Sequence, residues 1–148
     1  MSGTLLSTSA DKTFRIWDVN SSSINSTPTF ISKQNIKADI LCCDWNKFDS
    51  NQFILGYASG LIEIRDLRNL NGPPLKSIEN AHDYAVRKVK YSPHFANLFG
   101  SVSYDMMTKL WTTNEGLVEC SQNHSEFAYG FDFDPKMPNR LVDCGWDR

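Results

Sequence analysis

The first side chains to consider are those that could form a hydrolytic triad. His82, Ser103 and Asp105 supply an imidazole base, a hydroxyl nucleophile and a carboxylate, the groups that acyl-transfer enzymes bring together. The same residue types return elsewhere in the chain, at Ser9, Asp11, His124 and Asp147. Because a catalytic centre does not recur once per repeat, we expect no enzyme, and a hydrolase that uses His82 is the least favoured of three functional hypotheses.

A fixed spacing of six residues relates these side chains to aromatic or basic partners further along the chain. It separates Asp11 from Trp17, Ser59 from Arg65, and Asp105 from Trp111. Asp147 matches the aspartate position of this pattern, but only Arg148 follows it. The sequence therefore stops inside a repeat, and we expect it to be part of a longer protein.

A second set of anchors gives the length of the repeat. Trp45, Tyr91 and Phe133 each end a short apolar segment, and they are separated by 46 and 42 residues. In the clearest block, apolar runs and turn residues predict four strands, at 86–91, 98–103, 107–112 and 116–121. A period near 40–45 with four short strands is typical of a WD-repeat propeller blade.

The predicted fold is therefore all-β, a partial WD40 β-propeller with two complete four-stranded blades and two incomplete ones. The first segment supplies the last three strands of a blade, the next two segments are complete blades, and the last supplies only the first two strands. The expected boundaries of these segments are 1–34, 35–80, 81–123 and 124–148.

The likeness to WD-repeat proteins gives the triad-like residues a different role. In that family a His, a turn Asp, a strand Ser or Thr and a Trp hydrogen-bond to one another and fix the loops of a blade. The resemblance implies such a structural tetrad at His82, Ser103, Asp105 and Trp111, with Ser9, Asp11, Trp17, His124 and Asp147 as its counterparts in other blades. The second segment departs from the pattern, with Ile36 at the His position and Ser59-Gly60 at the turn, so we expect it to rely more on packing.

Composition excludes several other classes of protein. Fifteen basic and 17 acidic residues give a net charge of -2, which is not the footprint of a nucleic-acid-binding domain. No apolar run approaches the roughly 20 residues of a membrane-spanning helix, and the first residues lack a secretory signal. The four cysteines have neither zinc-ligand nor disulfide spacing, so we expect no metal or other cofactor.

One end of the propeller is the expected binding surface. We call the first strand of each blade the inner strand. Some of the residues that line this surface come directly before a tight turn, and others come directly before an inner strand. Two more lie two positions further along the inner strand. A surface of aromatic, small and acidic residues could accept an amphipathic helix with a cation near its carboxylate, although the same residues could simply fill space between blades. These residues are Asp39, Ala58, Ala85, Arg87, Tyr104, Phe127, Tyr129 and Trp146.

Several segments are more particular than the general repeat. They lie at 38–45, 66–69, 86–94, 103–105 and 142–147. In order and spacing they resemble the C-terminal half of the peroxin-7 family, the receptors for the type 2 peroxisomal targeting signal.

This resemblance implies a cytosolic receptor that cycles to the peroxisome, binds an N-terminal nonapeptide of cargo proteins and works with a co-receptor and docking machinery. The peptide would be an amphipathic helix with a basic residue and leucines, and the resemblance places Asp39 opposite its cation. Tyr104, Phe127 and Trp146 would form an apolar wall. From the charge and the apolar runs we also expect no nucleic-acid partner and no insertion into the membrane. The alternative is a general WD40 interaction scaffold, such as a ubiquitin-ligase, chromatin or RNA-processing adaptor.

Overall fold

The computed structural model describes residues 3–20, 27–32 and 38–147, and it arranges them in four antiparallel sheets. A three-stranded sheet is followed by two four-stranded sheets and a two-stranded sheet, each formed by neighbours in sequence. The strands are β1 (Thr4–Thr8), β2 (Phe14–Asp18) and β3 (Phe30–Ile31); β4 (Ile40–Trp45), β5 (Gln52–Tyr57), β6 (Ile62–Asp66) and β7 (Lys76–Ile78); β8 (Val86–Tyr91), β9 (Leu98–Ser103), β10 (Thr108–Thr112) and β11 (Gly116–Ser121); and β12 (Ala128–Phe133) and β13 (Leu141–Gly145).

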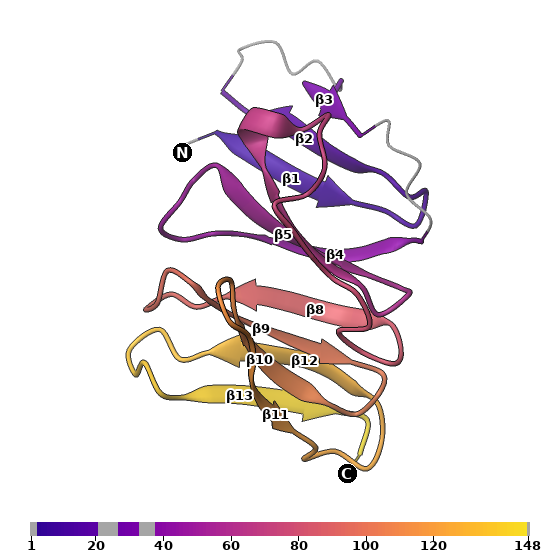
Figure 1. Cartoon of the computed structure of the whole chain (residues 1–148), viewed down its shortest axis with the longest axis vertical. Coiled ribbons are helices and arrows are strands. Elements are labelled where there is room, and N and C mark those ends of the chain that lie inside the picture. The colour runs from indigo at the N-terminus through magenta and orange to yellow at the C-terminus, as the bar shows by residue number, and fades with distance from the viewer. Residues whose placement is uncertain (1–2, 21–26, 33–37, 148) are drawn as a thin grey trace.

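The sheets follow one another along the long axis of the molecule, in the order of the sequence (Figure 1). This arrangement confirms the predicted all-β, partial WD40 propeller with two complete blades and two incomplete ones. We call the sheets blades 1 to 4 in chain order. The expected boundary between residues 34 and 35, and Ile36 at the histidine position, lie outside the described residues.

The hydrophobic core consists of separate layers, each between two consecutive blades. Along β5 the side chains alternate: Phe53, Leu55 and Tyr57 belong to the layer shared with blade 1, whereas Ile54 belongs to the layer shared with blade 3. This two-residue period is the strand geometry that directs successive side chains to opposite faces. Because both faces of a blade are apolar, each blade buries its core residues only by stacking on its neighbours.

The inner strands β4, β8 and β12 all have an irregularity near their first residues. The pairing with the second strand skips one residue in each, namely Leu41, Arg87 and Tyr129. A β-bulge of this kind leaves one residue unpaired and changes the direction of its side chain. Two of these three residues, Arg87 and Tyr129, belong to the predicted binding surface.

The strand ends differ slightly from the sequence-based ranges. The third strand of blade 3 begins at Thr108 and not at residue 107, because Met106 adopts a positive φ of 67° in the preceding turn. A short 3-10 helix, Leu67–Asn69, follows β6 and was not predicted. Its first turn is capped by the Asp66 carboxylate, which accepts a hydrogen bond from the Arg68 N–H.

The close approach of blades 3 and 4 gives a stability prediction. A Cβ atom added at Gly100 in β9 would lie 2.6 Å from Cε2 of Phe131 in β12, which is shorter than van der Waals contact. We therefore expect Gly100→Ala to lower the free energy of unfolding by about 1–3 kcal/mol, the usual cost of overpacking a core, as measured by urea denaturation.

The matched control for this substitution removes the obstacle. Phe131→Leu shortens the side chain that the new methyl group meets, so the double variant should be more stable than the sum of the two single effects predicts. Simple additivity would show that the alanine methyl group does not press on Phe131.

Candidate functional site

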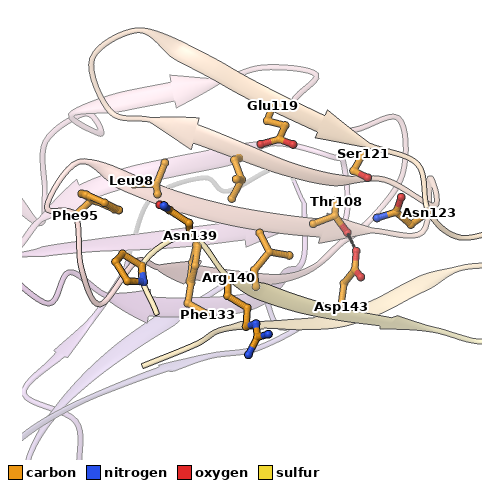
Figure 2. Close-up of a pocket in the computed structure, with 13 residues that line it drawn as sticks. Phe95, Leu98, Thr108, Glu119, Ser121, Asn123, Phe133, Asn139, Arg140 and Asp143 are labelled. Atoms are coloured by element: carbon orange, nitrogen blue, oxygen red, sulfur yellow. Dashed lines mark hydrogen bonds between the residues drawn. The ribbon is translucent and has the colours of Figure 1, made fainter. Parts of the chain in front are cut away.

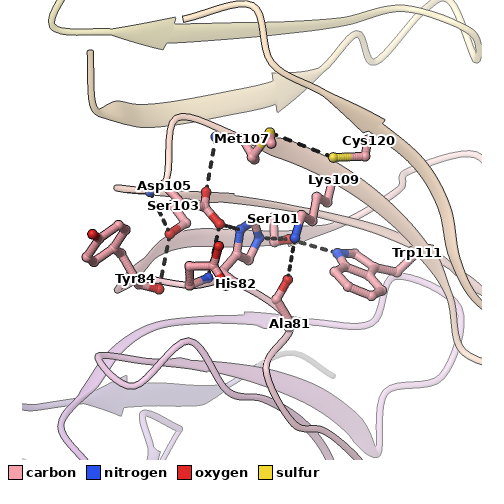
Figure 3. A network of polar contacts seen from close by, with 11 residues as sticks. Ala81, His82, Tyr84, Ser101, Ser103, Asp105, Met107, Lys109, Trp111 and Cys120 are labelled. Atoms are coloured by element: carbon pink, nitrogen blue, oxygen red, sulfur yellow. Dashed lines mark hydrogen bonds and ion pairs between the residues drawn. The ribbon is translucent and has the colours of Figure 1, made fainter. Parts of the chain in front are cut away.

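A network of buried hydrogen bonds joins the loop before β8 to β9, to the turn that follows β9 and to β10 (Figure 3). The Nδ1 atom of His82 lies 2.8 Å from Oδ2 of Asp105, and its Nε2 atom lies 2.7 Å from Oγ of Ser101. Nε1 of Trp111 donates to the same Oγ atom at 2.8 Å. His82 is 2% exposed and Ser101 is fully buried, so the loop, the turn and two strands are tied together away from water.

The serine that takes part in this hydrogen-bond network is Ser101, whereas the sequence predicted Ser103. Ser101 lies two residues further into β9, where it is diagonal to Trp111 on the same face. Ser103 ends the strand beside the turn, where its hydroxyl donates to the Tyr84 carbonyl and accepts the Asp105 N–H. The expectation for Ser103 is therefore wrong.

Blade 1 requires the same correction. Nε1 of Trp17 donates to Oγ of Ser7 at 2.8 Å. Ser9, which the sequence predicted for this position, instead accepts the Asp11 N–H in the turn. In both blades the serine that meets the tryptophan lies four residues before the turn aspartate.

The turn aspartates hold an unfavourable backbone in place. Lys12 and Met106, which follow Asp11 and Asp105, have φ values of 65° and 67°, a region that side chains other than glycine rarely adopt. The Oδ1 atom of Asp11 accepts the N–H of Thr13 at 2.9 Å, and the Oδ1 atom of Asp105 accepts the N–H of Met107 at 3.1 Å. Blade 2 has no aspartate here and places Gly60 at the corresponding position, with φ 83°.

The Asp105 carboxyl is held in its ionised form. Burial alone would raise its pKa, but the hydrogen bond and charge of His82 and the N–H groups of Met107 and Asp83 outweigh that effect. The pKa of Asp105 therefore lies below its usual value of 3.8. The carboxylate thus accepts hydrogen bonds from His82 and two backbone groups across the pH range in which proteins work.

Blade 4 modifies the histidine chain with a second carboxylate. Nδ1 of His124 lies 2.8 Å from Oδ1 of Asp147, but the position of Ser101 is taken by Asp143, 3.7 Å from His124 Nε2. Asp143 also accepts a hydrogen bond from Thr108 of blade 3 at 2.6 Å. Asp143 was not singled out from the sequence, although its place four residues before Asp147 marks it.

Blade 2 replaces the chain with a different polar group. Leu55 occupies the serine position, and Arg65 occupies the tryptophan position. Oε2 of Glu63 accepts hydrogen bonds from the Tyr57 hydroxyl at 2.6 Å and from Arg65 Nε at 2.8 Å. The Arg65 guanidinium also lies over the Phe14 ring of blade 1, 5.6 Å from its centroid, where a cation is attracted to the ring face.

The order Asp105, His82, Ser101 is that of a hydrolytic triad, but its nucleophile is blocked. The Ser101 hydroxyl is fully buried and already accepts the Trp111 N–H. A substrate carbonyl must reach the hydroxyl oxygen for acyl transfer. These contacts therefore favour a structural role for the group.

A second cluster of residues lies at the end of the blades where the inner strands begin. The Tyr104 and Phe127 rings have centroids 4.7 Å apart, and Trp146 lies 5.7 Å from Phe127 and 6.3 Å from Tyr129. The Arg87 guanidinium lies over both tyrosine rings, 5.2 Å from Tyr104 and 5.1 Å from Tyr129. We call these five residues the aromatic cluster.

The remaining predicted surface residues lie at the same end of the blades. The residue before each inner strand accepts, through its carbonyl, the N–H of the residue after the second strand. The pairs are Asp39 with Ala58, Ala85 with Tyr104, and Phe127 with Trp146. All eight predicted residues are therefore on equivalent positions of blades 2, 3 and 4, and five of them form the aromatic cluster.

A cavity of about 480 Å³ lies between blade 3 and blade 4, away from this end surface (Figure 2). Leu98, Phe133 and Leu141 give it apolar walls, and the hydrogen-bonded pair Thr108 and Asp143 lies at its edge. None of the eight predicted surface residues lines it. Within the described residues, no group of three or more His, Cys, Asp or Glu side chains could hold a metal ion, and no helix is long and apolar enough to cross a membrane.

The two serines of blade 3 can be distinguished by double-mutant cycles. Ser101→Ala and Trp111→Phe remove the two ends of one buried hydrogen bond, so we expect a coupling energy of about 0.5–3 kcal/mol between them. Ser103→Ala with Trp111→Phe is the matched control and should be additive. Urea denaturation of the single and double variants measures both values, and equal coupling in the two cycles would contradict the assignment of Ser101.

The ionised state of Asp105 gives a pH dependence. Because its pKa is lowered in the folded protein, its stabilisation is fully present above pH 3.8, the usual pKa, and is lost as the pH falls through the lower folded-state value. Asp105→Asn should reduce the free energy of unfolding by about 1–3 kcal/mol at pH 7, and the deficit should shrink below pH 3.8. Glu115→Gln, at an exposed loop position, is the control, and a deficit independent of pH would argue against an ionised Asp105.

Comparison with known proteins agrees with the arrangement of the sheets. Residues 2–18 and 72–112 match the family model described as "WD domain, G-beta repeat". The chain is 28% identical over 178 residues to the peroxisomal targeting signal 2 receptor of Saccharomyces cerevisiae, covering 97% of this chain and 47% of that protein. It is 35% identical over 82 residues to the receptor of the same name from Mus musculus, covering 54% of this chain and 25% of that protein.

A plant protein gives a similar match. The peroxisome biogenesis protein 7 of Arabidopsis thaliana is 37% identical over 73 residues, covering 48% of this chain and 23% of that protein. The chain thus spans between about a quarter and about half the length of these curated relatives. It matches the WD-repeat model over two segments, its sheets form a partial β-propeller, and its sequence is similar to the peroxisomal targeting signal 2 receptors.

Proposed function

We propose that this chain contributes part of the peptide-binding face of a receptor for the type 2 peroxisomal targeting signal. The observation that carries the proposal is that the aromatic cluster and Asp39 lie at the same end of the blades, where the inner strands begin. The names of the similar proteins, which are receptors for this signal, supply the class of ligand. A general WD40 scaffold remains the alternative, since the repeats alone do not select a ligand.

The aromatic cluster has the exposure expected of a binding surface. Phe127, Tyr129 and Trp146 are 40%, 46% and 63% exposed, although their rings contact one another. Large aromatic side chains lose little conformational entropy on binding and are common among the residues that contribute most to affinity. The apolar side of an amphipathic helix could pack on these rings.

Asp39 supplies a negative charge on the neighbouring blade. It occupies the position in blade 2 that Ala85 and Phe127 occupy in blades 3 and 4. None of the described residues forms an ion pair with its carboxylate, so a basic residue of the peptide could pair with it. Arg87 lies on blade 3 and bears the opposite charge. A bound peptide is therefore expected to place its basic residue towards blade 2 and its leucines towards blade 4.

The rest of the proposed role concerns the import cycle. A receptor of this kind would bind cargo proteins in the cytoplasm and deliver them to the peroxisome with a co-receptor and the docking machinery. The aromatic cluster uses no catalytic group, and the buried Ser101 hydroxyl is unsuited to acyl transfer. We therefore propose a receptor, not an enzyme.

The experiment that tests this role measures binding of a fluorescent type 2 targeting peptide to the purified chain by anisotropy. Asp39→Lys should weaken binding at least about tenfold, because it replaces an attractive charge with a repulsive one. Trp146→Ala should weaken it by a similar factor by removing an aromatic contact.

Two controls make the result specific. Glu115→Lys changes the charge by the same amount at an exposed loop position and should leave the affinity unchanged. A peptide with its basic residue replaced by glutamate should bind weakly to the chain and better to Asp39→Lys. If both Asp39→Lys and Trp146→Ala bound the peptide with unaltered affinity, the proposed face would be wrong.

A further inference from the structure

The turns that follow the three inner strands share one backbone arrangement. In each, the first side chain accepts hydrogen bonds from two N–H groups, two and three residues later. Asn46 binds the N–H groups of residues 48 and 49, Ser92 those of residues 94 and 95, and Asp134 those of residues 136 and 137, at 2.8–3.2 Å. The three turns are therefore built alike and rigidly capped.

Each of these turns presents one large apolar side chain to the surface. Phe48 is 55% exposed, Phe95 is 47% exposed and Met137 is 54% exposed. The turns lie next to one another at the left edge of the molecule in Figure 1, where the inner strands end. We call these three residues the turn ridge. Because the inner strands begin at the aromatic cluster and end here, the turn ridge lies at the opposite end of the blades.

A basic cavity opens beside the turn ridge. It has a volume of about 900 Å³, and Lys47, Pro93 and Pro135 from the three turns line it together with Phe133, Leu141 and Val142. Its charged lining consists of four cations, Lys47, Lys90, Lys136 and Arg140, and two carboxylates, Asp132 and Asp134. The whole chain has a net charge of -2, whereas the charged residues that line this cavity carry more positive than negative charge.

The cations differ in how far they are neutralised. Lys90 pairs with Asp132 at 2.5 Å, and Lys47 pairs with Asp44 at 2.7 Å. No described residue forms an ion pair with Lys136, and Arg140 lies 3.8 Å from Asp134 with most of its side chain exposed. Positive charge therefore remains available next to the exposed apolar side chains.

We propose that the turn ridge and the basic cavity form a second docking surface, which binds an acidic, apolar peptide segment of a partner protein. The ridge supplies apolar contacts at one position on each of three blades, and Lys136 and Arg140 supply the charge that attracts glutamate or aspartate side chains. A protein segment fits better than an anionic membrane, because a peptide can place its carboxylates at Lys136 and Arg140 and away from Asp132 and Asp134, which a uniformly negative surface cannot do. The surface is independent of the proposed cargo face, so both ligands can bind together.

The test uses a dye-labelled peptide of about 12 residues, made of glutamate and leucine with the leucines on one helical face. Fluorescence anisotropy with the purified chain should show saturable binding that weakens as salt is raised. The combined variant Phe48→Ser, Phe95→Ser and Met137→Ser should lose at least about tenfold in affinity, as expected when several anchors are removed. Lys136→Glu should also weaken binding.

The matched control changes three other side chains of similar exposure. Leu75, Leu117 and Val118 are 56%, 52% and 55% exposed, and their combined replacement by serine should leave the affinity unchanged. Trp146→Ala should likewise leave it unchanged, which separates this surface from the cargo face. Circular dichroism of each variant checks that the sheets are intact.

Three results would overturn the proposal. One is equal affinity for a peptide with lysine in place of glutamate. Another is retention of full affinity by the turn-ridge variant. The third is a chain that ignores the acidic peptide but binds phosphatidylserine vesicles through the turn ridge, which would make it a membrane contact.

Discussion

The burial of apolar sheet faces between consecutive blades is the constraint on which the rest of this structure depends. In β5 both Ile54 and Leu55 are fully buried although they point to opposite faces, so blade 2 needs a neighbour on each side. The same stacking brings Phe131 of blade 4 against Gly100 of blade 3. Once the blades are stacked, corresponding loops and turns lie side by side at both ends, and their exposed side chains are brought together into larger surfaces.

The polar network within each blade is less constrained than this packing. Blade 3 uses His82, Ser101 and Trp111, whereas blade 2 reaches a closed arrangement with Glu63 and Arg65. Both solutions satisfy buried donors and acceptors, which is what low-dielectric surroundings demand, and neither depends on one residue type. In blade 3 the network ties the loop before the inner strand to the blade, whereas in blade 2 the polar group links side chains of the second and third strands.

The periodic features of the sequence predicted the fold well, because strand alternation and repeat length follow from burial on two faces. The site was harder to predict for a geometric reason. Ser101 and Ser103 point to the same side of β9, so alternation cannot distinguish them, and only the pairing with Trp111 does. The bulges at Arg87 and Tyr129 arise because the strand pairing skips one residue, and the type of residue at these positions does not predict such a skip. Phe48, Phe95 and Met137 lie in turns, and a single apolar residue outside a periodic element does not predict whether its side chain is buried or exposed.

These two kinds of position explain how a repeat can acquire specificity. A bulge lies within a backbone-paired strand, and each capped turn is held by the side chain of its first residue. The exposed side chain at either position can therefore vary without loss of the fold. The bulged residue is Leu41 in blade 2, Arg87 in blade 3 and Tyr129 in blade 4. Three chemically unrelated side chains thus occupy the same kind of β-bulge. Packing therefore does not dictate these residues, whereas it does dictate Phe99 or Ile62, both of which are fully buried. A ligand that spans adjacent blades contacts a different chemical group on each blade. The order of these groups from blade to blade therefore determines the orientation in which the ligand binds.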